Sequence, residues 1–362
     1  MNLPATHPLV DGRTAASALI RAYRGDRPER LPVWFMRQAG RSLPEYRDLR
    51  VGTAMLDACL NPELSSEITL QPVRRHGVDA AIFFSDIVVP LRLAGVDVDI
   101  VPGRGPVLGA PIRSTADVAA LRPLDPDALA PIAEGVARTV AELGATPLIG
   151  FAGAPFTLAA YLVEGGPSKD HLRARTLMHA DPGTWDALLT WAAGVTGTFL
   201  RAQVLAGASA VQLFDSWVGS LSVRDYESRV APFSQLALGH VKDLDVSVVH
   251  FGVGTAQLLN SMHAIGVDVM GVDDRLPLDE ASARLGGTVP LQGNINPAFL
   301  AAPWPVLEAH VRDVIERGKA APAHVLNLGH GVPPEADPDA LTRIVELAHG
   351  ELAHGELAAE DA

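Results

Sequence analysis

Two arginines four positions apart, Arg37 and Arg41, are the residues whose type and spacing most directly suggest chemistry. They follow the apolar run 31–36, which has the composition of a short buried strand. If a helical turn comes next, side chains four residues apart lie on one face, and two aligned guanidinium groups bind a carboxylate or a phosphate. The alternative is a pair of surface arginines. We favour the anion clamp because it directly follows a buried strand, and Arg47 and Arg50 extend the basic strip more weakly.

A carboxylate, Asp86, comes directly after Ser85 at the end of the most apolar strand-like run, residues 80–84. Burying a carboxylate costs free energy or shifts its pKa unless the group meets a cation or hydrogen-bond donors. Such a group could stabilise positive charge that develops on a substrate. The alternative is a residue that caps the next helix.

Three further residues are candidates for ligand contacts. His330 lies between Gly329 and Gly331, so the backbone there can approach a ligand and the imidazole can point into a cavity. A histidine packed in the core is an equally good interpretation. Ser216 and Tyr161 carry hydroxyl groups that could bind carboxylates, although such residues are common near loops.

Lysine and cysteine are scarce, which excludes several kinds of chemistry. Lys169, Lys242 and Lys319 are the only lysines, and each lies in a polar or helix-like stretch rather than at a strand end, where a Schiff-base lysine is needed. The single cysteine, Cys59, can form neither an internal disulfide nor a thiolate zinc site by itself. The histidines show no zinc-motif spacing beside a glutamate. We therefore predict that the protein binds no metal.

The charge balance excludes two classes of partner. The chain has 29 basic and 42 acidic residues, a formal net charge of −13, which repels nucleic-acid phosphates and anionic lipid head groups. No apolar stretch approaches the roughly 20 residues that span a bilayer, and residues 1–10 lack a basic segment followed by an apolar run. We expect no nucleic-acid or membrane partner, and a cytoplasmic location.

The elements that must position these residues alternate along the chain. Strand-like runs occur at residues 31–36, 80–84, 147–151, 210–214, 246–251, 267–272, 289–292 and 324–328. Between them lie stretches with helical apolar spacing, such as 182–205 and 304–318. Eight strands alternating with helices predict an α/β fold, a single-domain (β/α)8 TIM barrel, in which active-site groups come from the carboxyl ends of the strands. A doubly wound open sheet is the alternative, but no Gly-x-Gly-x-x-Gly motif follows the first run.

Three segments lie outside this repeat. Residues 1–30 are predicted to be an N-terminal extension with one short helix near 15–23, and residues 31–345 to be the barrel. Residues 96–112 predict a hairpin insertion after the second strand, turning at 103–106. Residues 346–362, which contain a duplicated His-Gly-Glu sequence, are predicted to be a disordered acidic tail.

Two long motifs and four shorter ones follow one another along the chain. The long motifs are residues 32–41, continued at 43–47, and residues 150–165; the shorter ones are 84–86, 214–219, 292–297 and 327–332. In type and order they closely resemble the uroporphyrinogen decarboxylase family. The resemblance runs from residue 32 to about residue 334, so only the extension and the tail lie outside it.

The resemblance implies a reaction. Enzymes of this family remove carbon dioxide from the four acetate arms of uroporphyrinogen III and produce coproporphyrinogen III, in the biosynthesis of haem. The family uses no metal or organic cofactor and is usually a homodimer. There are two alternatives: a barrel methyltransferase that uses zinc, and a non-catalytic tetrapyrrole-binding protein. The methyltransferase would need a His-x-Cys pair that this chain lacks.

The resemblance also implies the site. Arg37 and Arg41 would hold acetate and propionate groups, with Gln38, Ala39 and Gly40 between them as further substrate contacts. Asp86 would reach the pyrrole N–H groups at the centre of the macrocycle. The remaining contacts implied are Tyr161, Ser216 and His330, and the expected catalytic group consists of Asp86, Arg37, His330 and Tyr161.

Overall fold

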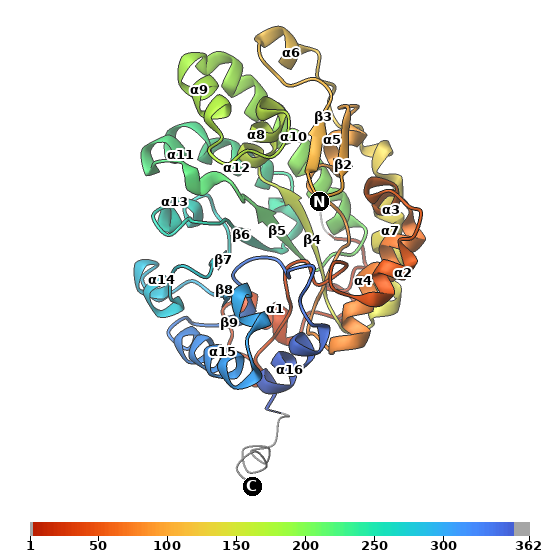
Figure 1. Ribbon diagram of the computed structural model, residues 1–362, viewed down its shortest axis with the longest axis vertical. Helices are drawn as coiled ribbons and strands as arrows, with labels where there is room; N and C mark the ends of the chain where they lie inside the picture. Colours follow the sequence, from red (N-terminus) through yellow and green to blue (C-terminus); the bar gives the residue numbers. More distant parts are fainter. Residues whose placement is uncertain (1–2, 351–362) are drawn as a thin grey trace.

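A parallel β-sheet, curled into part of a barrel, organises the molecule (Figure 1). The structure is a computed structural model that describes residues 3–350. Within them the sheet order is β1-β4-β5-β6-β7-β8-β9, with bounds β1 (Ala81–Ile82), β4 (Leu148–Gly153), β5 (Ala210–Phe214), β6 (Ser247–Phe251), β7 (Val269–Gly271), β8 (Leu291–Ile295) and β9 (His324–Leu328). Nearly every strand residue is buried, as expected for a parallel sheet covered by helices. The predicted α/β class is confirmed.

The first predicted strand, residues 31–36, is shorter than expected, because only an isolated parallel bridge joins Val33 to Leu326 of β9. Several of its N–H groups bond to side chains instead of to a neighbouring strand. Val33 N donates to Asp79 Oδ2 at 2.8 Å, Phe35 N to Gln38 Oε1 at 2.8 Å, and Met36 N to Asn327 Oδ1 at 2.9 Å. On the other side, Asp79 N donates to Val33 O at 2.8 Å. The segment therefore links β9 to the residues before β1, but not as a regular strand.

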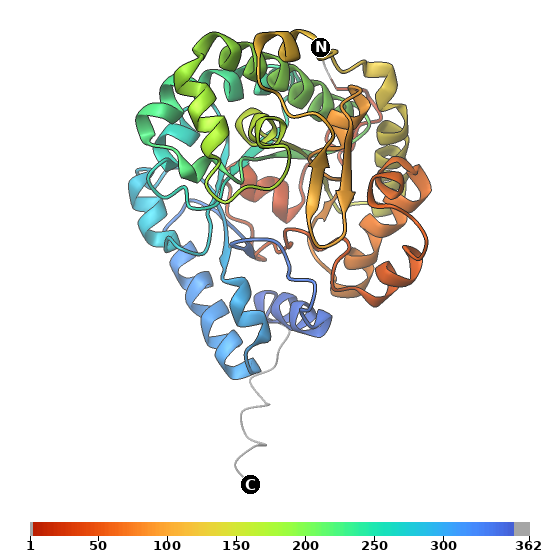
Figure 2. The same cartoon turned by 45° about the horizontal axis from the view of Figure 1, so that its top comes forward.

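Helices surround the sheet, as Figure 2 shows from a second direction. The α-helices of the described residues are α1 (Ala18–Tyr23), α2 (Pro44–Leu49), α3 (Met55–Leu60), α4 (Pro62–His76), α5 (Val89–Leu93), α6 (Thr115–Ala119), α7 (Ala130–Leu143), α8 (Pro155–Glu164), α9 (Leu172–Ala180), α10 (Pro182–Leu205), α11 (Val223–Arg229), α12 (Ala231–Leu238), α13 (Leu259–His263), α14 (Leu278–Arg284), α15 (Trp304–Gly318) and α16 (Pro338–Ala348). The short 3₁₀ helices are η1 (Pro126–Leu129), η2 (Val218–Ser220), η3 (Lys242–Leu244) and η4 (Pro297–Ala301). The two helices predicted at 182–205 and 304–318 are confirmed as α10 and α15.

The N-terminal residues pack against the barrel. The buried His7 side chain bonds to Val204 O at 3.1 Å, at the end of α10. From α1, Tyr23 OH donates to Gln292 Oε1 at 2.5 Å, inside the barrel. Gln292 Nε2 in turn donates to Gln212 Oε1 at 2.9 Å. This segment thus contributes to the floor of the barrel.

An antiparallel pair, β2 (Val98–Val101) and β3 (Gly105–Leu108), follows β1 and α5. Leu108 N donates to Gly165 O at 3.2 Å, so the hairpin is held against the loop that follows α8. Figure 2 shows the hairpin, in orange, standing at the edge of the helical ring.

The predicted tail begins too early. Residues 346–348 belong to α16, whose apolar side, including Ile344 and Leu347, is buried against the core. The next residue, His349, is bonded through Nε2 to Asp79 Oδ2 at 2.8 Å. Residues 351–362 of the predicted tail lie outside the described residues. From residue 3 to 350, no helix is long and apolar enough to cross a membrane.

Candidate active site

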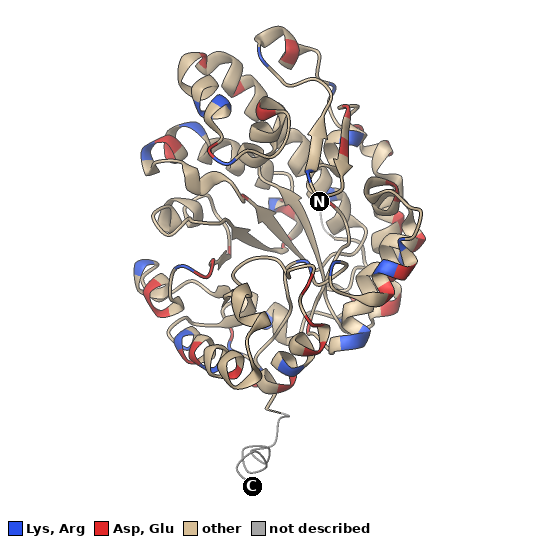
Figure 3. Ribbon diagram, viewed as in Figure 1, with Lys and Arg blue, Asp and Glu red and all other residues tan. Residues whose placement is uncertain are grey.

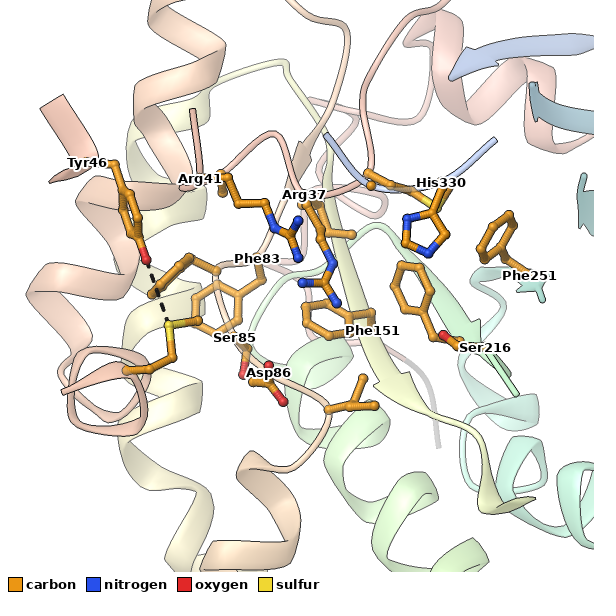
Figure 4. A pocket seen from close by; sticks show the side chains of 18 residues that line it. Arg37, Arg41, Tyr46, Phe83, Ser85, Asp86, Phe151, Ser216, Phe251 and His330 are labelled. Carbon is orange, nitrogen blue, oxygen red and sulfur yellow. Dashed lines mark hydrogen bonds between the residues drawn. The ribbon is translucent and has the colours of Figure 1, made fainter. Parts of the chain in front are cut away.

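One cavity lies at the carboxyl ends of the strands and encloses about 910 Å³, measured to its open mouth. Its lining comes from the loop after Val33, from the ends of β1, β4, β5 and β6, and from the turn after β9 (Figure 4). The polar or charged lining residues are Arg37, Arg41, Tyr46, Ser85, Asp86, Ser216 and His330. The apolar ones are Met36, Ala39, Met55, Ile82, Phe83, Phe84, Ile87, Phe151, Phe214 and Phe251, with Gly331. This location is where a barrel is expected to carry its active site.

Arg37 and Arg41 both reach the cavity, but no helical turn carries them. Each has a left-handed backbone, with φ of 62° and 45°, which is uncommon for residues other than glycine. Such conformations persist where the surroundings over-determine them, often at functional sites. The expected one-face helical geometry is therefore wrong, although the two side chains converge in the cavity as predicted (Figure 4).

The two guanidinium groups carry charge that the described residues do not neutralise. Between residues 3 and 350, neither Arg37 nor Arg41 forms an ion pair, and Arg41 donates one bond, to Val332 O at 3.3 Å. Burial first, and the positive charge of Arg37 second, lower the pKa of Arg41 to about 10. With this pKa Arg41 is still positively charged at neutral pH and available to an anion.

Gly331 makes room for Arg37. A Cβ on Gly331 would lie 2.5 Å from Arg37 Cδ and 2.9 Å from Cγ. Similarly, Gly329 has no space for a side chain, because a Cβ there would meet Asp274 N at 2.3 Å. The glycines on either side of His330 therefore serve close packing as well as the exposure of the imidazole.

Asp86 lies across the cavity from the arginines (Figure 4). Its Oδ1 accepts a hydrogen bond from Val88 N at 3.0 Å, just before α5. Its Oδ2 makes no hydrogen bond within the described part of the chain, and the residue lines the cavity. Burial raises the pKa of Asp86, opposed by the Val88 N–H and by the charges of Arg37 and Arg41. Asp86 thus holds a turn just before α5 but does not cap that helix, whose N-cap residue is Val88.

His330 lines the cavity and is exposed as a whole residue. The cavity walls desolvate its ring, which lowers its pKa, and the positive charges of Arg37 and Arg41 lower it further. The imidazole is therefore mainly neutral at pH 7 in the free protein. A bound carboxylate would oppose both causes and favour its protonated form.

The two hydroxyl residues are placed differently. Ser216 lines the cavity, and its hydroxyl makes no hydrogen bond to the described residues. Tyr161, on α8, is not part of the cavity wall; its ring stacks on Trp217, with centroids 3.9 Å apart and planes tilted by 31°. Burial first, and the charge of Asp86 second, raise the pKa of Tyr161 to about 12, so its hydroxyl stays protonated.

Of the residues between the two arginines, only Ala39 lines the cavity. The predicted contact through Gln38 is not met by its side chain, which is buried and bonds to Phe35 N and, at 2.9 Å, to Ala80 O. Gly40, with φ of 98°, lies behind the wall, against Tyr46 and a neighbouring phenylalanine. These two residues shape the loop.

Arg47 and Arg50, the weaker extension of the basic strip, are also outside the wall. Arg47 donates to Pro334 O at 2.7 Å. Arg50 donates to Tyr46 OH at 2.9 Å and lies over that ring, 5.5 Å from its centroid. Arg50 thus fixes Tyr46 rather than reaching the cavity itself.

The apolar wall was not predicted from the sequence. Phe214 and Phe251 end β5 and β6, and Phe151 lies near the end of β4. The three rings pack edge to face, with centroids 5.4 and 6.0 Å apart. Tyr46 and Met55 close another side and are joined by a hydrogen bond, dashed in Figure 4. The available signal was position: a phenylalanine that closes a strand is at the end of the barrel that faces a ligand.

The described residues contain no group of three or more histidine, cysteine or acidic side chains that could hold a metal ion. Cys59 is buried, and burial raises the pKa of its thiol. On the outer helices, acidic and basic positions are intermixed (Figure 3). The arginine-lined mouth is thus a local exception on a chain of net charge −13.

Comparisons with known proteins agree over nearly the whole chain. The sequence profile of the family described as uroporphyrinogen decarboxylase (URO-D) matches residues 14–351. The chain is 71% identical over 340 residues to a uroporphyrinogen decarboxylase of Arthrobacter sp. (strain FB24), covering 94% of this chain and 99% of that protein. It is 65% identical over 369 residues to one of Leifsonia xyli subsp. xyli (strain CTCB07), covering 96% and 98%.

A solved structure of similar fold is a methyltransferase from Methanosarcina mazei. Its TM-score is 0.78 at 20% identity, with 93% of this chain and 98% of that chain covered. At this level of identity the likeness concerns the fold alone.

Proposed function

The chain belongs to the uroporphyrinogen decarboxylase family, and we propose that it decarboxylates the four acetate side chains of uroporphyrinogen III to methyl groups. The products are coproporphyrinogen III and four molecules of carbon dioxide, in porphyrin and haem biosynthesis. One observation carries the proposal at the level of the site. A single cavity is lined by Asp86 and, across from it, by Arg37 and Arg41.

The arginines suit the charge of this substrate. Uroporphyrinogen carries eight carboxylates, and an acidic protein must concentrate positive charge where such a ligand enters. Arg37 and Arg41 do so, and charge-assisted hydrogen bonds from guanidinium to carboxylate are among the stronger ones available. Ser216 and Tyr161 would add neutral hydroxyl donors for further carboxylates.

The aromatic side of the cavity suits the macrocycle. Phe151, Phe214 and Phe251 present apolar surface beside the charged groups. Ligand sites commonly combine a mainly apolar wall with a few placed polar groups. The pyrrole rings would contact this wall while the carboxylates reach the polar rim.

Asp86 would act at the centre of the macrocycle. Loss of carbon dioxide leaves an electron pair that needs a sink, and a pyrrole protonated at a ring carbon provides one. The acetate C–C bond then breaks towards this cation, carbon dioxide departs, and a proton added to the exposed methylene gives a methyl group. A carboxylate at the pyrrole N–H groups stabilises the cation, an effect typically worth about 3–4 kcal/mol of barrier.

Because the substrate supplies this electron sink, the proposed reaction needs no metal or organic cofactor. For proton delivery, arginine is a poor acid. His330 is the better donor on chemical grounds, since bound carboxylates would oppose the lowering of its pKa and favour the protonated imidazole.

We also propose a homodimer in the cytoplasm. The homodimer is what the family resemblance implies. Sedimentation equilibrium of the purified protein tests the dimer: a mass near 38 kDa would contradict it and twice that mass would support it.

The reaction is tested by incubating the purified protein, without oxygen, with chemically reduced uroporphyrin III. Oxidation and chromatography then count the carboxylates. We expect species with seven, six and five carboxylates and finally four, with the same rate in a chelator. An unchanged eight-carboxylate substrate would contradict the proposal.

A further inference from the structure

A second charged side chain, Asp215, is fully buried directly behind the cavity wall. Its neighbours in the chain, Phe214 and Ser216, both line the cavity. Its Oδ1 accepts a hydrogen bond from Thr157 Oγ1 at 2.8 Å. Its Oδ2 lies 3.8 Å from Nε2 of His250, which is also fully buried, and neither atom has a hydrogen-bond partner within residues 3–350. The proposed reaction gives neither residue a role.

Thr157 connects Asp215 to two parts of the site. Its Oγ1 also accepts from Trp217 N, at 3.4 Å, so one hydroxyl joins Asp215 to the backbone two residues further on. On α8, Thr157 precedes Tyr161 by one helical turn. The position of α8 relative to the loop after β5 is therefore fixed at this hydroxyl.

Trp217 completes the connection. Its ring stacks on Tyr161, with centroids 3.9 Å apart, and His171 packs against it with centroids 4.4 Å apart. A displaced Trp217 would displace Tyr161 with it. The chain of contacts thus runs from Asp215 through Thr157 and Trp217 to Tyr161.

We infer that Asp215, held between Thr157 and His250, is a positioning residue for the two hydroxyl donors of the site, Ser216 and Tyr161. It acts on Ser216 through the adjoining backbone and on Tyr161 through Thr157 and Trp217. The inference rests on the proposed function, in which both hydroxyl groups bind substrate carboxylates.

The burial of Asp215 favours this role over simple packing. A fully buried carboxylate is costly to desolvate, and an apolar side chain of similar size would often stabilise a fold as well or better. Here the carboxylate is kept where its polar contacts lead to Ser216, which lines the cavity, and through Trp217 to Tyr161 on α8. Thr157 is also fully buried. Replacing it with valine removes the connecting hydroxyl and changes the shape of the side chain little.

The test compares Thr157→Val, which removes the hydroxyl, with Thr157→Ser, which keeps it. We expect Thr157→Val to raise KM for uroporphyrinogen about tenfold, with a smaller effect on kcat, because hydrogen bonds to charged groups are partly lost. Thr157→Ser should restore KM to within about twofold of the wild type. The matched control is Thr139→Val, a fully buried threonine whose hydroxyl bonds to Gly135 O within α7. It should lower stability and leave KM unchanged.

A double-mutant cycle with Tyr161→Phe separates positioning from general damage. If Thr157 acts through Tyr161, the double variant should be little worse than the more affected single variant. The inference would be overturned if the KM increases of Thr157→Val and Tyr161→Phe multiplied in the double variant. It would also be overturned if KM were the same in Thr157→Val and Thr139→Val.

Near-ultraviolet circular dichroism gives a readout that needs no activity. The contribution assigned to Trp217, from the difference between wild type and Trp217→Phe, should be lost in Thr157→Val and kept in Thr157→Ser. An unchanged spectrum in Thr157→Val would overturn the inference even if the enzyme is active. An inactive wild type would instead contradict the proposed function.

Discussion

The loop 37–41 and the turn 84–88 face each other across the cavity and are built in opposite ways. The loop holds its arginines in left-handed backbone conformations, with Arg37 exposed and Arg41 partly buried. The turn has an ordinary backbone, in which Val88 N donates to Asp86 Oδ1, but it holds a carboxylate where burial raises its pKa. The arginine loop therefore has a strained backbone, whereas at the turn of Asp86 the energetic cost is the desolvation of a carboxylate.

This difference predicts which variants should alter substrate binding and which should alter turnover. A partly solvated cation can attract carboxylates from solution at little desolvation cost. A desolvated carboxylate interacts more strongly with a cation that forms beside it. Changes on the arginine side should mainly alter KM, and changes at Asp86 should mainly alter kcat.

The largest expected effect is that of Asp86→Asn. Removing the charge that stabilises the pyrrole cation should lower kcat by about 10²–10³-fold, with a small change in KM. The comparison variant is His330→Asn, which should lower turnover only severalfold. Anaerobic initial rates with uroporphyrinogen III measure both, and equal, near-complete loss in the two variants would contradict this ranking.

Arg37→Gln and Arg41→Gln should come next. Each removes a charge-assisted hydrogen bond, typically worth 1.5–3 kcal/mol, so KM should rise about 10- to 100-fold while kcat falls less. Because Arg37 is the more exposed, wild-type KM should increase with salt, and less steeply in Arg37→Gln. Unchanged KM with a lost kcat in these variants would mean that the arginines act in chemistry instead.

Gly331→Ala tests how the loop is held. The new Cβ would lie 2.5 Å from Arg37 Cδ, so the guanidinium must move, and we expect KM to rise about tenfold through partial loss of its bonds. The matched control is Gly194→Ala, in α10, where an added Cβ meets nothing within 4 Å. If both glycine variants have wild-type KM, Arg37 is not held by this packing.

The smallest expected effect concerns stability. The pKa of Asp86 is raised from 3.8 in the folded protein, so the ionised carboxylate destabilises the fold above that raised pKa, and the penalty disappears below the unfolded value. Asp86→Asn should therefore raise Tm at pH 7, by about 1–2 °C per kcal/mol of relieved penalty. The gain should shrink as the pH is lowered towards 4. Thermal unfolding followed at both pH values measures it, and a lower Tm for the variant at pH 7 would contradict the sign.

The sequence was sufficient for the parts of the fold that depend on local pattern. Helices α10 and α15 and most strands follow from apolar periodicity and occur where it predicts them. The run 31–36 differs because Asp79 and Asn327, distant in sequence, take its N–H groups. These side-chain hydrogen bonds depend on tertiary contacts, which the apolar periodicity of the sequence does not reveal.

The site divides in the same way. Arg37, Arg41 and Asp86 could be predicted because charged side chains after apolar strands are unusual. The left-handed backbone of both arginines could not, since it depends on packing against residues such as Gly331. The phenylalanine wall was missed because a phenylalanine at the end of a strand has the same pattern as one in the core.

The central claim, that the arginines bind and Asp86 carries the chemistry, is tested most directly by single-turnover kinetics of Asp86→Asn and Arg41→Gln in parallel. Substrate affinity and the rate of the first decarboxylation are measured separately, under anaerobic conditions. The account predicts that Asp86→Asn binds uroporphyrinogen nearly as the wild type does but loses the first carbon dioxide about 10²–10³-fold more slowly. It predicts that Arg41→Gln binds more weakly and, once saturated, reacts at nearly the wild-type rate. Weak binding with a normal rate in Asp86→Asn would contradict it.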